Sequence, residues 1–191
     1  MKITKRLFSF LLCAALLLSA LPASAELVVE VYEYENLRYT VSYHQVVITG
    51  IARPAEGYVN IPDTINGDPV VGIGSYAFYR SDITGVYIPE TVRGIGDSAF
   101  EHCTGLTSVT IPDSVTNIGS RAFAQCTALE TLRLQGDLET MGEYAFYGCT
   151  KLKDLTLEWG IKDIGAHSFK QCDSIRIHVP SAVGPCAIAA T

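Results

Sequence analysis

"IPDSVTNIGSRAFAQCTALETLR", residues 111–133, is one of a series of similar segments along the chain. Three consecutive segments of the same length match it: "IPETVRGIGDSAFEHCTGLTSVT" (88–110), "LQGDLETMGEYAFYGCTKLKDLT" (134–156) and "LEWGIKDIGAHSFKQCDSIRIHV" (157–179). Three residue types recur every 23 residues: Gly96, Gly119, Gly142 and Gly165; Phe100, Phe123, Phe146 and Phe169; Cys103, Cys126, Cys149 and Cys172. A divergent copy, residues 61–87, precedes them with extra residues near Asn66 and with Ser81 in place of the cysteine. A fixed period of this length predicts a solenoid of stacked units.

Aliphatic residues in each unit predict one short parallel strand. Leu106, Val109 and Ile111 have the L-x-x-V-x-I spacing of a leucine-rich repeat, and the next two units repeat it. Because side chains alternate along a strand, Val109 and Ile111 should point into the core, with Ser108 and Thr110 pointing outward. Proline cannot donate to a strand ladder, so the proline that follows Ile111 should end the strand.

The rest of each unit is expected to turn the chain back. Gly119 marks a turn, and residues 120–125 predict one helical turn that directs Phe123 into the core. The predicted fold class is therefore an α/β repeat, a right-handed leucine-rich-repeat solenoid with one short parallel strand per coil of about 23 residues.

The repeats closely resemble the BspA-like leucine-rich repeat family, whose pattern is I-P-x-x-V-x-x-I-G-x-x-A-F-x-x-C-x-x-L. The resemblance covers residues 61–179. It implies an exported bacterial surface or secreted protein that acts in binding or adhesion. The corresponding domain organisation is a signal peptide (1–25), an N-terminal β cap (26–60), about five repeats (61–180) and a short tail (181–191).

The segment before the repeats predicts a β-hairpin. "LRYTVSY" (37–43) alternates apolar and polar residues, His44 and Gln45 can form a turn, and "VVITG" (46–50) returns. A solenoid end exposes an unpaired strand edge, so this hairpin is expected to cap the first coil.

The first residues predict a secretory signal peptide. Lys2, Lys5 and Arg6 precede an apolar run, and the small residues around Ala25 predict cleavage after it. The alternative, a membrane anchor, needs roughly 20 apolar residues, which is more than this run has. Loss of the three cations lowers the formal net charge from −6 to −9. An acidic exported chain is a poor candidate for binding nucleic acid, and we expect no transmembrane span.

The cysteine column has three readings. One cysteine per coil forms a line, whereas zinc sites use close doublets, so no metal is expected. Disulfides between coils have a possible Cα separation, but parallel side chains keep the Cβ atoms too far apart for good geometry. Ser81 in the same column favours the third reading, a ladder of buried, reduced thiols.

Other motifs do not indicate catalysis. "GIGSYA" (72–77) and "GIGDSA" (94–99) match the dinucleotide-binding pattern, but they fall within repeat copies and no βαβ unit surrounds them. No G-x-S-x-G or H-E-x-x-H motif occurs, and the histidines are scattered. We therefore predict no enzyme activity and no cofactor.

The outward strand positions give the candidate binding residues. One residue per coil lies between the two inward positions and should face solvent: Asn60, Tyr87, Thr110, Arg133, Thr156 and His178. Trp159 is expected beside the same face. Aromatic residues and arginine concentrate binding energy, which suggests a patch centred on Tyr87, Arg133 and Trp159. The alternative is that these are ordinary solvated strand positions.

The predicted function is recognition of a protein or glycan partner on a host or neighbouring cell surface by a secreted or surface-held protein. The alternative is a structural spacer, or a fragment of a larger surface protein, without a ligand of its own.

Overall fold

The computed structural model describes residues 30–52, 56–134, 138–157, 161–173 and 175–178. These residues form strands and turns and contain no helix. The predicted signal peptide, the tail and Trp159 lie outside the described residues.

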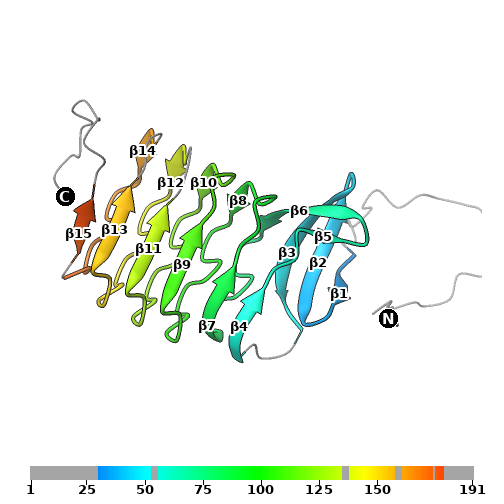
Figure 1. The fold of residues 1–191 in the computed structure, drawn as a ribbon, viewed down its shortest axis with the longest axis horizontal. Coiled ribbons are helices and arrows are strands. Elements are labelled where there is room, and N and C mark those ends of the chain that lie inside the picture. Colours follow the sequence, from blue (N-terminus) through cyan, green and yellow to red (C-terminus); the bar gives the residue numbers. More distant parts are fainter. Residues whose placement is uncertain (1–29, 53–55, 135–137, 158–160, 174, 179–191) are drawn as a thin grey trace, which may run out of the picture.

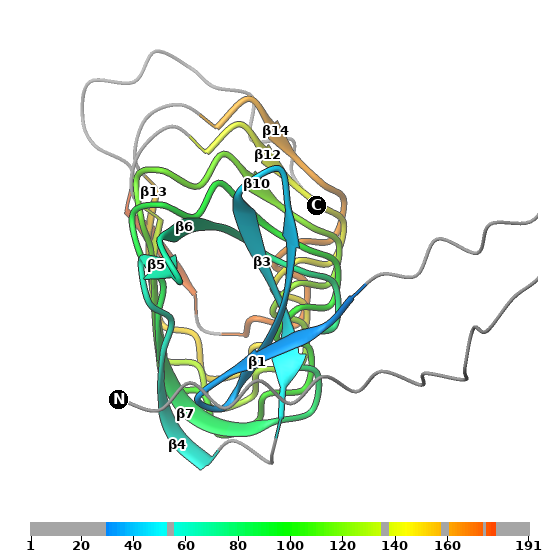
Figure 2. The same ribbon diagram turned by 90° about the vertical axis from the view of Figure 1, so that its right-hand side faces the viewer.

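The strands form two sheets that run the length of a solenoid (Figure 1). Sheet B contains six parallel strands: β4 (Glu56–Asn60), β7 (Asp82–Tyr87), β9 (Ser108–Ile111), β11 (Thr131–Leu134), β13 (Asp154–Leu157) and β15 (Arg176–His178). Sheet A contains nine: β1 (Tyr32–Tyr34), β2 (Leu37–Ser42), β3 (Gln45–Ile51), β5 (Thr64–Ile65), β6 (Asp68–Ile73), β8 (Gly94–Ile95), β10 (Asn117–Ile118), β12 (Thr140–Met141) and β14 (Asp163–Ile164). Viewed along the solenoid, sheet B lies on one side of the coil and the short strands of sheet A on another (Figure 2).

Each regular coil therefore has two strands, whereas the sequence analysis predicted one. The second strand is short, as in β10, where Ile118 is buried and Asn117 is exposed. Asn117 lies between Gly94 and Thr140 of the neighbouring coils. Because stacking places equivalent residues side by side, even two extended residues per coil are enough to continue a sheet.

The predicted helical turn at residues 120–125 is wrong. Arg121 and Gln125 have φ angles of 57° and 60°, which are incompatible with a right-handed helix. The N–H groups of Phe123 and Gln125 donate to the carbonyls of Ala145 and Tyr147 in the next coil, at 2.7 Å in both cases. The backbone here bonds between coils, so the fold is a β-solenoid of the leucine-rich-repeat type and not an α/β repeat.

The stacking follows the repeat period. Thr131 lies opposite Ser108 in one neighbouring strand and Asp154 in the other, each 23 residues away. Val109 and Ile111 are buried, and Ser108 and Thr110 are exposed, as alternation predicted. One repeat unit is therefore one coil.

Phenylalanine side chains form the centre of the core. Phe100, Phe123 and Phe146 are fully buried, and their rings stack nearly parallel with centroids 4.9 and 5.1 Å apart. The rings of Phe78 and Phe169 extend the same column at its two ends. Stacked aromatic residues bury a large apolar area, which makes this column a principal source of stability.

The cysteine column consists of free, buried thiols. Each thiol donates to a phenylalanine carbonyl of the preceding coil, as Cys126 does to Phe100 at 3.1 Å. Ser81 occupies the same column in the divergent unit, and its hydroxyl donates to the carbonyl of Phe78 at 2.8 Å. Burial raises the pKa of the Cys103 thiol and holds the pKa of Cys126 well above its usual range. The column thus supplies small donors to inward-facing carbonyls.

A glycine recurs in each coil at a position where two coils approach closely. A Cβ atom on Gly119 would lie 2.6 Å from the backbone nitrogen of Asp97 in the preceding coil. Gly96, Gly142 and Gly165 meet the same obstacle. By contrast, a Cβ on Gly94 would have its nearest neighbour at 4.0 Å. This explains why the first glycine of G-x-G is replaced in other coils and the second is not.

The N-terminal segment is antiparallel. β2 and β3 pair through a turn at Tyr43 and His44, both of which have positive φ, and β3 then pairs in parallel with β6. The extra residues near Asn66 form the turn between β5 and β6. The Asn66 amide donates to the Tyr39 hydroxyl at 3.1 Å, which ties this turn to β2.

Candidate functional site: the outward face of sheet B

The predicted binding residues lie in one row across sheet B. Asn60 is paired with Tyr87, Arg133 with Thr110 and Thr156, and Thr156 with His178. β7 and β9 share the same 23-residue register, which places Tyr87 next to Thr110. The side chains of Asn60, Tyr87, Thr110, Arg133 and His178 are exposed. The structure thus brings together the predicted row, apart from Trp159, which lies outside the described residues.

A second outward row runs parallel to the first and was not singled out from the sequence. It contains Tyr58, Gly85, Ser108, Thr131, Asp154 and Arg176. Tyr58 is 67% exposed, and a Cβ on Gly85 would lie 2.7 Å from a carbon of its ring. Applying the two-residue period of a strand backward from the first row would have found these positions.

The two rows give sheet B an aromatic end and a charged end. Tyr58 and the 44% exposed Tyr87 lie on adjacent strands near the N-terminal end of the sheet. At the other end, a carboxylate oxygen of Asp154 lies 3.5 Å from Arg176 and 3.7 Å from His178. The Asp154, Arg176 and His178 side chains are 50%, 73% and 63% exposed, and ion pairs between exposed groups contribute little to stability. They remain available to a ligand.

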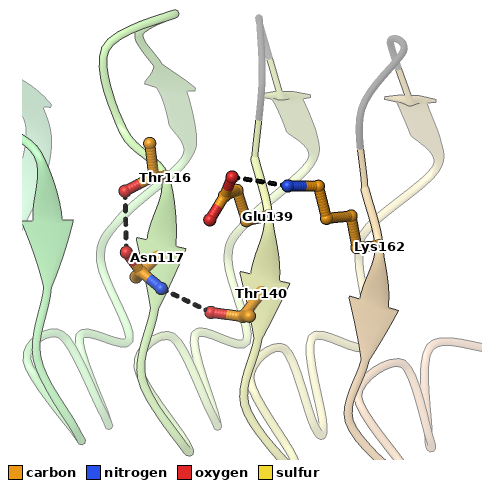
Figure 3. A network of polar contacts seen from close by, with 5 residues as sticks. All are labelled: Thr116, Asn117, Glu139, Thr140 and Lys162. Atoms are coloured by element: carbon orange, nitrogen blue, oxygen red, sulfur yellow. Dashed lines mark hydrogen bonds and ion pairs between the residues drawn. The ribbon is translucent and has the colours of Figure 1, made fainter.

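The outward side of sheet A carries a different kind of surface, a set of polar contacts between coils (Figure 3). Asn117 donates to the Thr140 hydroxyl at 2.7 Å and accepts from Thr116 at 2.7 Å. The Lys162 ammonium lies 2.6 Å from a Glu139 carboxylate oxygen. These side chains satisfy one another across three coils, so they are better explained as links between coils than as a ligand site.

The structure also bears on the motifs that suggested other chemistry. Gly94 of the second G-x-G-x-x-A motif lies in β8, and turns follow it where a dinucleotide-binding motif requires a helix N-terminus. Within the described ranges, no group of three or more His, Cys, Asp or Glu side chains is placed to hold a metal ion. No helix in the described part of the chain is long and apolar enough to cross a membrane.

Two sheets whose strands are parallel through the repeats, a 23-residue coil and a continuous phenylalanine column define the class of the protein as a leucine-rich-repeat solenoid. The family described as "BspA type Leucine rich repeat region (6 copies)" matches residues 71–186. The chain belongs to the BspA-type leucine-rich repeat family, as the sequence pattern indicated. Proteins of this family and fold are typically interaction modules and not enzymes.

Solved structures share the fold. A leucine-rich repeat protein of T. pallidum is 29% identical, with 79% of this chain and 72% of that chain covered and a TM-score of 0.73. The pneumococcal vaccine antigen PcpA is 18% identical (80% and 50% covered, TM-score 0.60). A leucine-rich cell surface protein of Faecalibacterium prausnitzii is 21% identical (80% and 55% covered, TM-score 0.50). This chain spans about half the length of the last two. A comparison with curated proteins gave no match.

Proposed function

We infer that this protein is an exported recognition module that binds a protein or glycan partner at or outside the cell surface. The observation that carries this proposal is the pair of exposed, in-register rows on sheet B. A parallel sheet of six strands holds these side chains in a fixed array, so a ligand can bind with little loss of side-chain and backbone freedom.

Support for a location outside the cell comes from two sources. The N-terminal residues have the charge and apolar pattern of a cleaved secretory signal. One protein with the same fold is described as a cell surface protein. We place cleavage after Ala25, and the intact mass of the exported protein should equal that of residues 26–191. A mass that includes Lys2 would contradict this part of the proposal.

The aromatic end of sheet B and the adjacent arginine are the most suitable place for the partner. Tyr58 and Tyr87 offer rigid rings with a hydroxyl at the edge, and Arg133 offers five donors. Trp159 is retained in the proposed patch from its position in the sequence. Together with Asn60, Thr110, Thr156 and His178, these residues form the proposed ligand-binding surface.

Binding to host-cell or neighbouring-cell surfaces tests this function. The variant in which Tyr87, Arg133 and Trp159 are all changed to Ala should bind more than about 30-fold more weakly. The control changes Thr116, the residue before β10 on the sheet A side, to Ala and should bind as the parent does. The circular-dichroism melt of both proteins should stay within a few degrees of the parent. Equal binding by the triple variant would remove sheet B as the site, and no saturable binding by the parent would favour a structural spacer.

We also infer that the β2–β3 hairpin caps the solenoid. β3 pairs with β6 and β1 pairs with β2, so the hairpin lies at the N-terminal end of sheet A with β1 as the outermost strand. Leu37, Val46 and Ile48 of the hairpin are buried. Its removal would expose this apolar surface and the edge of β6, which should cause association or aggregation measurable by light scattering.

A further inference from the structure

Two aromatic clusters that share a Tyr-Ala-Phe-Tyr segment lie on the turns that connect sheet A to sheet B. In the first, the rings of Tyr76 and Tyr79 meet edge to face, with centroids 5.7 Å apart and planes at 77°. The Arg80 guanidinium lies 5.3 Å from the centroid of the Tyr79 ring, and His102 contacts the same ring edge to face. This cluster is solvent-accessible, because Tyr76 is 61% exposed and Tyr79 39%.

The second cluster, three coils away, repeats the tyrosine pair, but its arginine and histidine contact the first tyrosine of the pair and both of its tyrosines are only partly exposed. Tyr144 and Tyr147 have centroids 5.6 Å apart and the same interplanar angle of 77°. The Arg121 guanidinium lies 5.0 Å from the centroid of the Tyr144 ring, and the His167 ring packs against Tyr144 at 5.1 Å. With about 4.8 Å between neighbouring strands, the two tyrosine pairs are about 15 Å apart along the solenoid.

The backbone at these clusters is not suited to tyrosine. Tyr76 and Tyr144 have φ angles of 60° and 58°, in the left-handed region where glycine is favoured and other residues are strained. The sequence accepts glycine on this turn surface, since Gly148 has a φ of 71°. The equivalent residues of the other coils, Ser98, Arg121 and His167, also have positive φ, so this conformation belongs to the turn itself, and glycine can replace either tyrosine without backbone strain.

The chemistry of the clusters favours a neutral, hydroxyl-rich ligand. The charged residues of these turns balance, since Arg80, Arg121 and Lys170 are matched by Asp97, Glu101 and Glu143. Arg121 itself lies 3.8 Å from Glu101. The tyrosine rings present flat apolar faces, and the arginine, histidine and phenol groups around them can donate or accept hydrogen bonds. This combination suits a sugar ring, which has an apolar C–H face and a rim of hydroxyl groups.

The spacing of the coils favours a polymer of sugars over an extended peptide. The two tyrosine pairs lie three coils, about 15 Å, apart, and side chains on one face of an extended peptide repeat about every 6.6 Å, so no whole number of peptide repeats matches this separation. The length of one pyranose unit in a linear polysaccharide is close to the coil spacing. A polysaccharide that lies along the turns can therefore reach both tyrosine pairs.

We propose that the turn surface formed by Tyr76, Tyr79, Arg80 and His102 and by Arg121, Tyr144, Tyr147 and His167 is a bivalent binding site for a linear, neutral polysaccharide. The site is separate from the rows on sheet B, and it stands or falls independently of them. Two clusters at a fixed separation increase the affinity for a long chain through effective concentration.

The test uses a panel of soluble neutral polysaccharides, a β-glucan, a mannan and a galactan, each as a long polymer and as a disaccharide. At least one polymer should bind, with little change in affinity between 50 and 500 mM salt. Changing Tyr76 to Gly should weaken binding of the polymer at least about 10-fold, and so should changing Tyr144 to Gly. For the matching disaccharide, which reaches one cluster only, either change alone should lower binding by about twofold.

Glycine is used because it separates binding from folding. It relieves the positive-φ strain, so each variant should melt within about 3 °C of the parent or above it. The control, Tyr43→Gly in the β2–β3 turn, removes a 96% exposed ring that also has a positive φ (49°), and it should leave polysaccharide binding unchanged. Four results would overturn the proposal: no binding across the panel, unchanged polymer binding by the glycine variants, a large fall in their melting temperature without loss of binding, or stronger binding to poly-glutamate than to any neutral polymer.

Discussion

The glycine column provides the sharpest test of the stacking geometry, and Gly119→Ala is the informative change. The new Cβ would lie 2.5 Å from the Asp97 side-chain oxygen and 2.6 Å from the Asp97 backbone nitrogen. Non-bonded heavy atoms are comfortable at about 3.5–4.0 Å. The two coils must therefore move apart locally by close to 1 Å, since the obstacle is mainly backbone.

The expected loss of stability follows from three contributions. Overpacking costs about 1–3 kcal/mol. The separation also lengthens the Gly119 N–H bond to the Ile95 carbonyl, now 2.8 Å, and the Ser120 N–H bond to Asp97, now 2.7 Å, each worth about 1 kcal/mol. In the opposite direction, alanine lowers the conformational entropy of the unfolded chain, which stabilises the folded state by about 0.4–1 kcal/mol. We expect a net loss of about 2–4 kcal/mol, or roughly 10 °C in melting temperature.

The matched control is Gly94→Ala, which changes the first glycine of the Gly94-Ile95-Gly96 segment in the preceding coil. Its Cβ would meet no atom closer than the Asn117 carbonyl oxygen at 4.0 Å. We expect a change within about 0.5 kcal/mol of the parent, in either direction. Urea denaturation followed by circular dichroism measures both variants. If Gly119→Ala is as stable as Gly94→Ala, the close approach of the coils is not what selects glycine in this column.

Three further predictions follow from the core and the polar contacts. Phe123→Ala should lower the free energy of unfolding by about 3–5 kcal/mol because it opens a cavity in the ring stack, and a loss below 1 kcal/mol in denaturant titration would mean that the rings do not share one column. Cys126 should react with an alkylating reagent slowly in native buffer and rapidly in urea without reductant. The free energy of unfolding should also fall as the pH rises above about 8.5, because thiols of the unfolded chain ionise there while the buried Cys126 thiol, with its raised pKa, stays protonated. A disulfide-linked peptide would refute both statements. Lys162→Ala should cost less than about 1 kcal/mol despite the 2.6 Å contact with Glu139, because both side chains are largely exposed, and its effect should shrink in high salt.

Much of the architecture could be predicted from repeat spacing alone. The 23-residue period fixed which residues stack, and the two-residue alternation placed Val109 inside and Arg133 outside. The helical turn at residues 120–125 could not be excluded in this way, because an Ala-Phe-Ala segment is compatible with a helix. What excludes it is hydrogen bonding to the next coil, a contact that exists only after the coils have stacked.

The candidate surfaces were predictable to different degrees. The row that contains Tyr87 follows directly from alternation, and its neighbour Tyr58 follows from the same rule applied one step earlier. The clusters around Tyr76 and Tyr144 were not foreseen, because their side chains come from turns with positive φ, where no simple period gives the direction of a side chain. Two occurrences of Tyr-Ala-Phe-Tyr in the sequence, at residues 76–79 and 144–147, are the signal that could have revealed them.

The hydrogen bonds between coils also determine how the protein responds to mechanical load. On the turn side, Phe100 donates to Ala122 and Phe123 donates to Ala145, so each coil is bonded only to its immediate neighbours and the bonds lie along the long axis. Tension applied to the two ends therefore acts on one junction at a time, beginning at the terminal coil. Release of one coil of 23 residues lengthens the chain by about 75–80 Å. The solenoid should therefore extend under force in a series of equal steps, one for each coil released.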